Sequence, residues 1–371
     1  MKKVILSLIA LAITTMASAF SFSATVESGQ TLYFTVIGID SVKVVAPATN
    51  WDGYTAPEGR LVIPASVTAE GETFQVKAID KMAFQYCRAL TAVSIPGSVV
   101  SIGQRAFYGD TLITSIQLGE GVESIGMMAF GSCTRLDTIQ LPSTLTLIAM
   151  SAFDNTAYFN DTLNWNSEMM LTLGQWVIRV GNRATDTVHV PEGIVGIANN
   201  AFLYCRYVEK VVLPSTLEII GFGAFKDCFE LDTLQLFADN PPSLEEDSFD
   251  GVTPMPVLVV PCGAAEAYAN TANHYWNAFS EVIEMPCPLP IPILAVEEVE
   301  ADGTLIVTAI QDGVLVRGAE GVALSVFDMT GRRVGHVARA QAEQRLLLPA
   351  AGVYVLLPED GNAVKIAYCS R

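Results

Sequence analysis

The segment Ala83–Arg105, AFQYCRALTAVSIPGSVVSIGQR, returns in outline as Ala201–Gly223, AFLYCRYVEKVVLPSTLEIIGFG. Both open on a small residue followed by Phe, and pairs of this kind begin at intervals of 23, 23, 23, 49, 23 and 24 residues. The pairs are Ala83-Phe84, Ala106-Phe107, Ala129-Phe130, Ala152-Phe153, Ala201-Phe202, Ala224-Phe225 and Ser248-Phe249. A period in the low twenties is the sequence signature of stacked coils of one supersecondary unit. The repeat therefore predicts a solenoid over residues 83–249.

Each coil carries two short extended runs. In the first coil, Val93 and Ile95 alternate with polar residues as in a half-buried strand. Pro96 ends this run because proline has no amide hydrogen to donate, and Val99–Ile102 forms the second run. A single coil cannot bury its apolar side, so it is stable only when it is stacked on others. The pattern predicts a mainly β solenoid with a parallel sheet along one side.

The pattern AFxxCxxLxxVxIPxSVxxIG, carried by Ala83–Gly103 and Ala201–Gly221, resembles the BspA-type leucine-rich repeats of bacterial surface proteins. The resemblance extends over about Leu61–Glu284. It implies a leucine-rich-repeat solenoid in a non-catalytic, secreted or cell-surface protein that mediates adhesion or protein–protein interaction. The implied partner is a host or bacterial surface protein. A surface glycan bound during nutrient capture is the alternative, and an aromatic platform around Trp165 would favour it.

Residues 1–19 have the features of a signal peptide. Two lysines precede the apolar run Val4–Ile13, and Ala17-Ser18-Ala19 supplies the small residues before a cleavage site. The run is too short for a stable membrane span, and no later stretch is long and apolar enough. We therefore expect an exported protein, secreted or on the outer membrane exterior, without a transmembrane segment after cleavage. Residues 20–82 are predicted to form an N-terminal β cap.

The period ends after the last repeat. Residues 250–285 include a short helical stretch and Trp276, and they are predicted to cap the C-terminal end of the solenoid. Alternating prolines make residues 286–293 a stiff extended linker. Residues 294–371 contain several strand-like runs and are predicted to form a small β-sandwich.

Three segments of this last module resemble the C-terminal sorting domain of type IX secretion. They are VFDMTGRRV at 326–334, LPAAGVYVL at 348–356 and VKIAYCSR at 364–371. Such a domain implies passage across the outer membrane. The end of the chain, Tyr368–Arg371, departs from the usual pattern, which leaves open a module with only a structural role.

The interval of 49 residues exceeds one period of 23 by 26 residues. It predicts one degenerate coil with an insertion near 155–182, whose projecting loop carries Tyr158, Phe159 and Trp165. Loops on repeat arrays often bind partners, and aromatic side chains anchor interfaces. These three residues are therefore candidates for partner binding. The alternative is that they pack over the irregular coil.

Other candidates lie along the predicted sheet, at positions between the buried ones. These positions are mostly small, polar and uncharged, and the candidates for partner binding among them are Ser94, Gln117, Gln140 and Gln235. Such side chains suit hydrogen-bonded contact with a protein or a glycan. They suit a plain solvated face equally well.

Charge and motif content exclude several classes of function. The net charge of −18 argues against nucleic acid as a partner, because that affinity depends on clustered Lys and Arg. The only histidines, His189, His274 and His336, lie in different predicted elements. Phosphate-binding, dinucleotide-binding and nucleophile-elbow motifs do not occur in the sequence. We therefore expect no enzymatic activity, no cofactor and no metal.

The cysteines fall into two groups. Four share one repeat position and are predicted to form a buried ladder of small side chains: Cys87, Cys133, Cys205 and Cys228. Cys205 and Cys228 lie in adjacent coils, but parallel side-chain directions disfavour a disulfide between them. Cys262 and Cys287 flank the capping segment of an exported protein and are the better candidates for a disulfide.

Overall fold

The computed structural model describes residues 20–271, 274–279 and 281–286, and further along the chain 306–310, 313–318, 320–328, 333–348, 352–358 and 364–368. The chain divides into two compact units, Met1–Met285 and Pro286–Arg371. Within the described ranges, none of the helices is long and apolar enough to cross a membrane.

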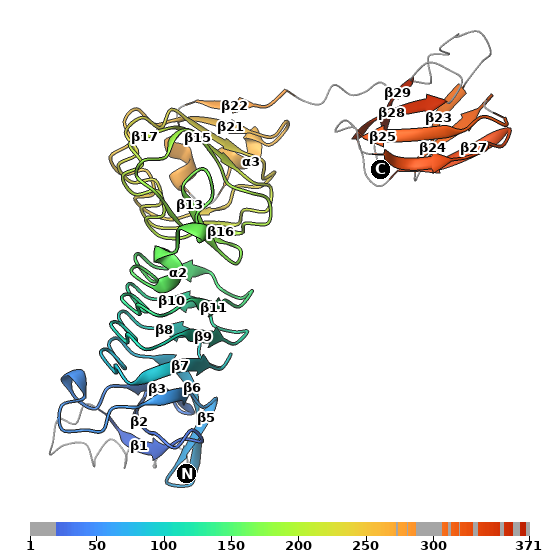
Figure 1. Ribbon diagram of the computed structural model, residues 1–371. Coiled ribbons are helices and arrows are strands. Elements are labelled where there is room, and N and C mark those ends of the chain that lie inside the picture. The colour runs from blue at the N-terminus through green and yellow to red at the C-terminus, as the bar shows by residue number, and fades with distance from the viewer. Residues whose placement is uncertain are drawn as a thin grey trace. The chain divides into compact units, whose positions relative to one another are not determined.

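The first unit begins with a β-rich segment that covers one end of the apolar core (Figure 1). Its elements are β1 (Phe22–Thr25), β2 (Thr31–Val36), β3 (Ser41–Val45), η1 (Thr49–Trp51), β4 (Gly59–Val62), β5 (Ser66–Ala69) and β6 (Glu72–Ile79). Trp51 is buried, stacks on Phe84 with ring centroids 6.0 Å apart, and donates from Nε1 to the Ala83 carbonyl at 3.0 Å. Its indole therefore closes the N-terminal end of the stack.

The coils that follow contribute one strand to each of two parallel sheets, and we call them the first stack. Sheet 1 contains β4, β7 (Leu90–Ile95), β9 (Ser115–Leu118) and β11 (Thr138–Gln140). The opposite sheet continues from β6 through β8 (Ser101–Ile102), β10 (Ser124–Ile125) and β12 (Leu147–Ile148). Pairing joins Val93 to Ile116 and Ile116 to Ile139, so each coil is in register with the next. The predicted mainly β solenoid is confirmed.

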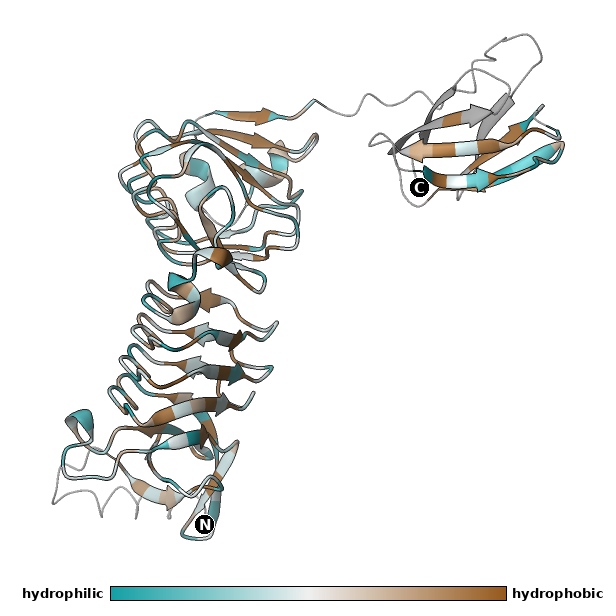
Figure 2. Ribbon diagram, viewed as in Figure 1, coloured by the Kyte–Doolittle hydropathy of each residue, from teal (hydrophilic) through white to brown (hydrophobic). Residues whose placement is uncertain are grey.

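Stacked phenylalanines form the centre of the core. Phe84, Phe107, Phe130 and Phe153 lie with successive ring centroids 4.9, 5.2 and 5.7 Å apart. All four are buried, because each ring is covered by the coil on either side. In Figure 2, brown hydrophobic positions recur along the strands of successive coils. This repeated burial is what the period of the sequence encodes.

A non-repeating segment interrupts the array after Phe153. It contains α2 (Ala157–Asn160), η2 (Thr162–Asn164), and the antiparallel hairpin of β13 (Met170–Leu173) and β14 (Trp176–Val180). The amide of Val180 donates to the Ala201 carbonyl at 2.7 Å, as Phe202 does to Ala224 at 2.8 Å. Val180 therefore occupies the place of the repeated Phe in a degenerate coil. From Trp176 onward the chain pairs in parallel with the next coil, so the irregular part of the predicted insertion precedes Trp176.

Both sheets are interrupted at this point, and the sheet expected along one side is not continuous. Sheet 2 starts afresh with β15 (Thr185–His189) and continues through β17 (Tyr207–Leu213), β19 (Thr233–Leu236), β21 (Val257–Val260) and β22 (Val282–Glu284). The opposite sheet restarts with β13, β14, β16 (Gly196–Ile197), β18 (Ile219–Ile220) and β20 (Ser243–Leu244). These coils form the second stack. The insertion contacts both stacks, because Tyr158 N–H donates to Leu136 O at 2.9 Å and Glu168 binds His189.

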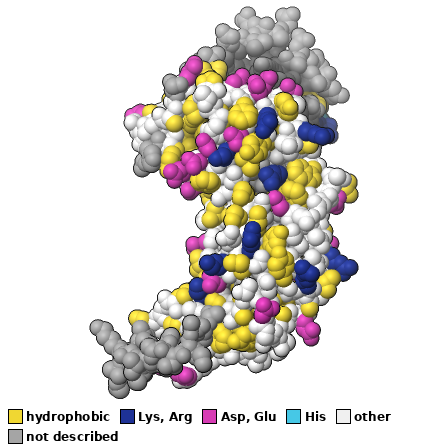
Figure 3. All heavy atoms as spheres, turned by 90° about the vertical axis from the view of Figure 1, so that its left-hand side faces the viewer, with side chains coloured by type: hydrophobic (Ala, Val, Ile, Leu, Met, Phe, Trp, Pro, Cys, Tyr) yellow, Lys and Arg dark blue, Asp and Glu magenta, His cyan; other side chains and the backbone are white. Residues whose placement is uncertain are grey.

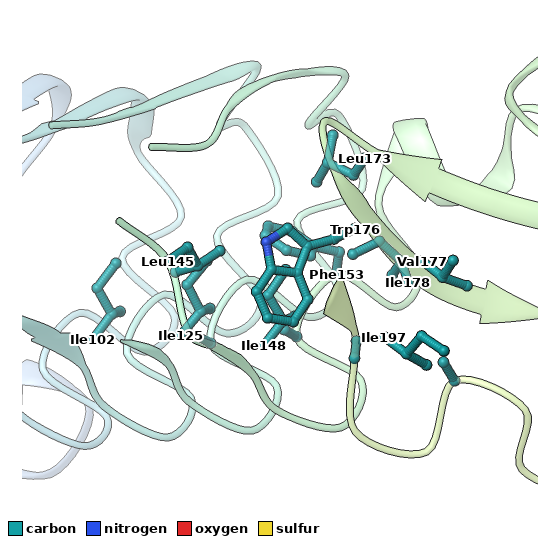
Figure 4. Close-up of a cluster of buried hydrophobic side chains, with 14 of the residues drawn as sticks. Ile102, Ile125, Leu145, Ile148, Phe153, Leu173, Trp176, Val177, Ile178 and Ile197 are labelled. Carbon is teal, nitrogen blue, oxygen red and sulfur yellow. The ribbon is translucent and has the colours of Figure 1, made fainter. Parts of the chain in front are cut away.

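Apolar side chains pack at the junction of the two stacks, beside a hollow of about 580 Å³ that Leu147, Trp176 and Ile197 help to line. Figure 4 shows Trp176 beside Ile148 and Phe153, with Ile197 on its other side. Trp176 is buried, and the Asn199 amide donates to the Ile148 carbonyl at 3.0 Å across the junction. The two stacks are therefore joined by a packed indole and a backbone hydrogen bond.

The second stack ends in a small cap that contains α3 (Ala265–Ala269) and η3 (His274–Ala278). Tyr268 and Trp276 are buried there, and they donate to the carbonyls of Ala238 and Pro242 at 2.9 Å each. In the second stack, Phe202, Phe225 and Phe249 form a row of stacked rings. Phe279 contacts Phe249, the last of these rings, edge to face at 5.1 Å.

The described residues of the second unit form two small antiparallel sheets. One contains β23 (Ile306–Ile310), β24 (Gly313–Arg317) and β27 (Glu343–Leu347), and the other β26 (Arg333–Val337), β25 (Leu324–Asp328), β28 (Gly352–Pro358) and β29 (Val364–Tyr368). Buried residues from both sheets, including Val316 and Val326, belong to one hydrophobic cluster. This arrangement is the one expected of a small β-sandwich.

Candidate recognition surface

Sheet 1 presents two rows of aligned side chains to solvent. Strand pairing aligns Arg60, Ala92, Ser115 and Thr138 in one row and Val62, Ser94, Gln117 and Gln140 in the other. All of these residues except Val62 line a hollow of about 250 Å³ on this face. The structure therefore brings together three of the four predicted sheet-face candidates, because a constant repeat length places equivalent positions on neighbouring strands.

The hollow is lined by both polar and apolar groups and is nearly uncharged. Gln117 and Gln140 are exposed, Ser94 is half-buried, and the only charged group in the lining is the Arg60 side chain at one end. Within the described part of the chain, the side chains of Ser94, Gln117 and Gln140 form no hydrogen bonds. Their donors and acceptors are available to a ligand, which makes this hollow the best candidate recognition site.

The fourth candidate, Gln235, lies on sheet 2 and is separate from the other three. Its Nε2 contacts Met285 Sδ at 3.4 Å. Around it the face of sheet 2 is more apolar, since Val212 and Val259 are its neighbours in register. The interruption of the sheets explains the separation, because β11 and β15 end their respective sheets.

The aromatic residues of the insertion pack mainly against their own segment. Tyr158 is half-buried, and its hydroxyl donates to the Thr172 carbonyl at 2.6 Å. Trp165 Nε1 donates to the Phe159 carbonyl at 2.9 Å, and the two rings meet edge to face at 5.5 Å. Burial raises the pKa of Tyr158. This geometry favours the packing interpretation, while a role in binding stays a prediction.

The cysteine ladder is buried and its thiols are free. Cys133 Sγ donates to the Phe107 carbonyl at 3.1 Å, and Cys228 Sγ donates to the Phe202 carbonyl at 3.1 Å. Burial raises the pKa of Cys133, and a hydrogen bond with Cys205 together with burial raises that of Cys228, so both thiols are neutral and unreactive. Cys205 and Cys228 do not form a disulfide.

Asp110 occupies the same ladder position between Cys87 and Cys133. It is fully buried, and neither carboxylate oxygen has a hydrogen-bond partner in the described residues. Burial raises its pKa to about 9, against the smaller opposing influences of the nearby Cys87 backbone amide and of Arg88. The sequence puts Asp110 at the ladder position but does not reveal that its carboxyl group is buried.

Other site predictions have limited structural counterparts. Cys262 is disulfide-bonded, and Cys287 lies outside the described residues, so the pairing of these two stays a prediction. Across the described ranges, His, Cys, Asp and Glu side chains form no group that could hold a metal ion.

Sequence reasoning missed a surface made by the turns that follow each buried Phe, here called the turn edge. Exposed Tyr86 and Tyr204 lie on it, each with an Arg guanidinium over its ring at 5.3 Å. The signal was present in the sequence, because Phe-x-Tyr-Cys-Arg occurs at both 84–88 and 202–206.

The coils, their register and the buried ladders define a leucine-rich-repeat solenoid. The BspA type Leucine rich repeat region matches residues 72–169 and 181–271 in six copies. These segments cover just over half of the sequence, and the chain belongs to this family.

Solved structures of leucine-rich repeat proteins also align with the chain. A leucine rich cell surface protein from Faecalibacterium prausnitzii is 19% identical, with 72% of this chain and 96% of that chain covered and a TM-score of 0.27. A leucine-rich repeat protein from Bacteroides ovatus is 17% identical, with coverage of 68% and 98% and a TM-score of 0.32. One from Bacteroides capillosus is 26% identical, with coverage of 38% and 95% and a TM-score of 0.30. No curated protein sequence matches.

Proposed function

We propose that this protein is a non-catalytic surface or secreted protein that binds a partner protein through the hollow of sheet 1. The observation that supports this most directly is the alignment of Ser94, Gln117 and Gln140, whose hydrogen-bonding groups have no partner among the described residues. Membership of the BspA-type family is consistent with protein–protein interaction or adhesion.

The physical basis is a rigid array of donors and acceptors. Neighbouring parallel strands lie about 4.8 Å apart, so amide and hydroxyl groups recur along the hollow at that spacing. They are fixed to strands over a packed core, so binding would order little more than the side chains themselves. A polar and nearly neutral surface of this kind suits a hydrogen-bonded contact with exposed backbone or side chains of a partner.

The glycan alternative receives less support. It depended on an aromatic platform at Trp165, and the Trp165 indole is half-buried against Phe159. Glycans therefore enter the experiment as a competing outcome.

The route to the surface is part of the same proposal. Residues 1–19 would direct export as a signal peptide, although they lie outside the described residues. The second unit would then act as a sorting domain, as the resemblance of 326–334 and 348–356 implies. Removal of residues 294–371 is expected to leave the protein inside the outer membrane, which cell fractionation would show.

The binding test uses the chain from Phe20 onward on arrays of host matrix proteins, bacterial surface proteins and glycans. The variant Gln117→Ala with Gln140→Ala removes two groups from the hollow, and Gln235→Ala on sheet 2 is a control of the same residue type. Two hydrogen bonds of about 1 kcal/mol each predict a loss of affinity of about thirtyfold in the double variant. Equal binding by the double variant, or binding to glycans alone, would contradict the proposal.

A further inference from the structure

The turns of the turn edge share one backbone conformation. Two residues after each repeated Phe the chain passes through the left-handed region, with φ between 58° and 78°. The residues at this position are Tyr86, Gly109, Ser132, Asn155, Tyr204, Asp227 and Gly251. Gly, Asn and Asp are the residues that adopt this conformation most readily, whereas a bulky aromatic residue is an outlier there. Tyr86 and Tyr204 therefore break a rule that most of the turns follow.

The exception is coupled to a second residue. Each of these tyrosines is followed two positions later by an arginine, whose amide donates to the tyrosine carbonyl, at 2.8 Å for Arg88 and 2.9 Å for Arg206. The equivalent positions in other coils carry Thr111, Thr134, Ala157, Phe229 and Thr253. Bulky residues take positive φ elsewhere in the coils too, at Met82, Arg105 and Met128, so the backbone alone does not mark these two turns. What sets them apart is the pairing of an exposed tyrosine with an arginine two positions later.

The two sites have similar geometry. At the first, the Arg88 guanidinium lies 5.3 Å from the Tyr86 ring centroid, and Tyr86 meets Tyr108 edge to face at 5.8 Å. At the second, the Arg206 guanidinium lies 5.3 Å from the Tyr204 centroid and 5.6 Å from that of Phe229. Figure 3 shows a face of the solenoid on which Lys and Arg side chains lie beside hydrophobic ones.

These rings are exposed. Tyr86 exposes 42% of its surface, Tyr204 45% and Phe229 48%. Exposed aromatic and arginine side chains in one cluster have the composition of an interface hot spot. Each site therefore offers apolar area and a cation within the same few residues.

The guanidinium groups carry unneutralised charge. Among the described residues, neither Arg88 nor Arg206 forms an ion pair, although the chain contains 39 acidic residues. The charge of Arg88 acts on the carboxyl group of Asp110. Burial raises the pKa of Asp110 to about 9, so this group is neutral at pH 7 and does not balance the charge of Arg88. A guanidinium over a ring face that forms no ion pair keeps N–H donors for bidentate contact with a carboxylate.

We propose that the turn edge binds a protein partner that presents exposed carboxylate side chains, with one contact point at Tyr86 and Arg88 and another at Tyr204 and Arg206. A protein is favoured over an anionic glycan because each tyrosine already has a guanidinium over one ring face, which removes that face as a platform for a sugar. This surface is distinct from the hollow of sheet 1, so the inference does not depend on the function proposed for that hollow.

The test measures binding of fluorescein-labelled poly-L-glutamate to the chain from Phe20 onward by fluorescence anisotropy at low salt. The variant Arg88→Gln with Arg206→Gln is expected to bind about tenfold more weakly or worse. Arg339→Gln with Arg345→Gln makes the same change in net charge at exposed positions of the second unit and is expected to bind like the native chain. Polygalacturonate, which carries carboxylates on sugars, serves as the glycan probe.

A second variant separates binding from folding. Tyr86→Gly with Tyr204→Gly removes the rings but suits a φ of 62°, so the fold should persist while affinity for poly-L-glutamate falls. The inference is overturned if poly-L-glutamate does not bind, if both arginine variants lose affinity equally, or if polygalacturonate alone binds.

Discussion

Replacement of Asp110 by Cys should stabilise the protein increasingly as pH rises. Asp110 lies in the ladder position that Cys87 and Cys133 occupy in the adjacent coils, and it is fully buried without a partner for its carboxyl oxygens in the described residues. Asp110→Cys places at this position the residue that already occupies it, buried, in both adjacent coils. Asp110→Asn is the matched control, because it removes the titration but keeps a buried polar group.

The magnitude follows from proton linkage. Burial raises the pKa of Asp110 from 3.8 to about 9, so the folded chain keeps a proton that the unfolded chain releases above about pH 4. The contribution of this proton to the free energy of unfolding is therefore fully present below the pKa of unfolded Asp110. It is lost as the pH rises toward the pKa of folded Asp110. Each pH unit in that window lowers the free energy of unfolding by about 1.4 kcal/mol, or about 4 kcal/mol between about pH 5.5 and about pH 8.5.

The assay is urea unfolding of the native chain and both variants, followed by tryptophan fluorescence with a thiol reductant. The lower pH limit stays above the sequence pI of about 4.5, where the chain would lose solubility. The stability difference between Asp110→Cys and the native chain should grow by about 4 kcal/mol across the pH range, with Asp110→Asn showing the same slope. Curves that run parallel with pH would show that Asp110 is ionised in the folded chain and would refute the reasoning.

Three further predictions concern packing in the first unit and are measured by the same urea titration. Phe130→Ala removes a buried ring from the ladder and should lower the free energy of unfolding by about 3 to 5 kcal/mol, with a smaller loss for Phe130→Leu. Gly196→Ala places a methyl group 2.5 Å from the Trp176 ring and should cost about 1 to 3 kcal/mol, which Trp176→Leu in the same chain should partly restore. Tyr158→Phe loses the hydrogen bond to the Thr172 carbonyl and should cost about 1 kcal/mol, whereas no change would mean that the insertion unfolds separately.

The sequence was sufficient to predict the coils because their core is periodic. Phe107 and Phe130 sit 23 residues apart and stack at 5.2 Å, and Val93 pairs in register with Ile116 as the period requires. The same period aligned Gln117 with Gln140 on sheet 1. A repeat fixes both which side chains are buried and which lie side by side on the outer face.

The insertion could not be predicted to the same degree. An excess of residues does not specify which sheet edge they will occupy. Gln235 was therefore grouped with the candidates of sheet 1, although sheet 1 ends at β11 and Gln235 lies on sheet 2, which begins at β15. Val180 takes the place of Phe in the degenerate coil without being aromatic, and the hydrogen bond that its amide donates to the Ala201 carbonyl identifies it. The turn edge was missed because φ is not visible in a sequence, although Gly109 and Asn155 at the shared position were a hint.

The interruption also explains how one repeat can carry surfaces of different chemistry. Each coil contacts only its neighbours, so residues on the outer face of one stack can change without effect on the core of the other. The face of sheet 1 is polar around Gln117, whereas that of sheet 2 carries Val212 and Val259. The turn edge departs from the repeat at Tyr86 in one stack and at Tyr204 in the other, so both stacks contribute to it. Variants of the hollow should therefore leave binding at the turn edge unchanged, and loss of both activities from one such substitution would mean that the junction at Trp176 couples the stacks.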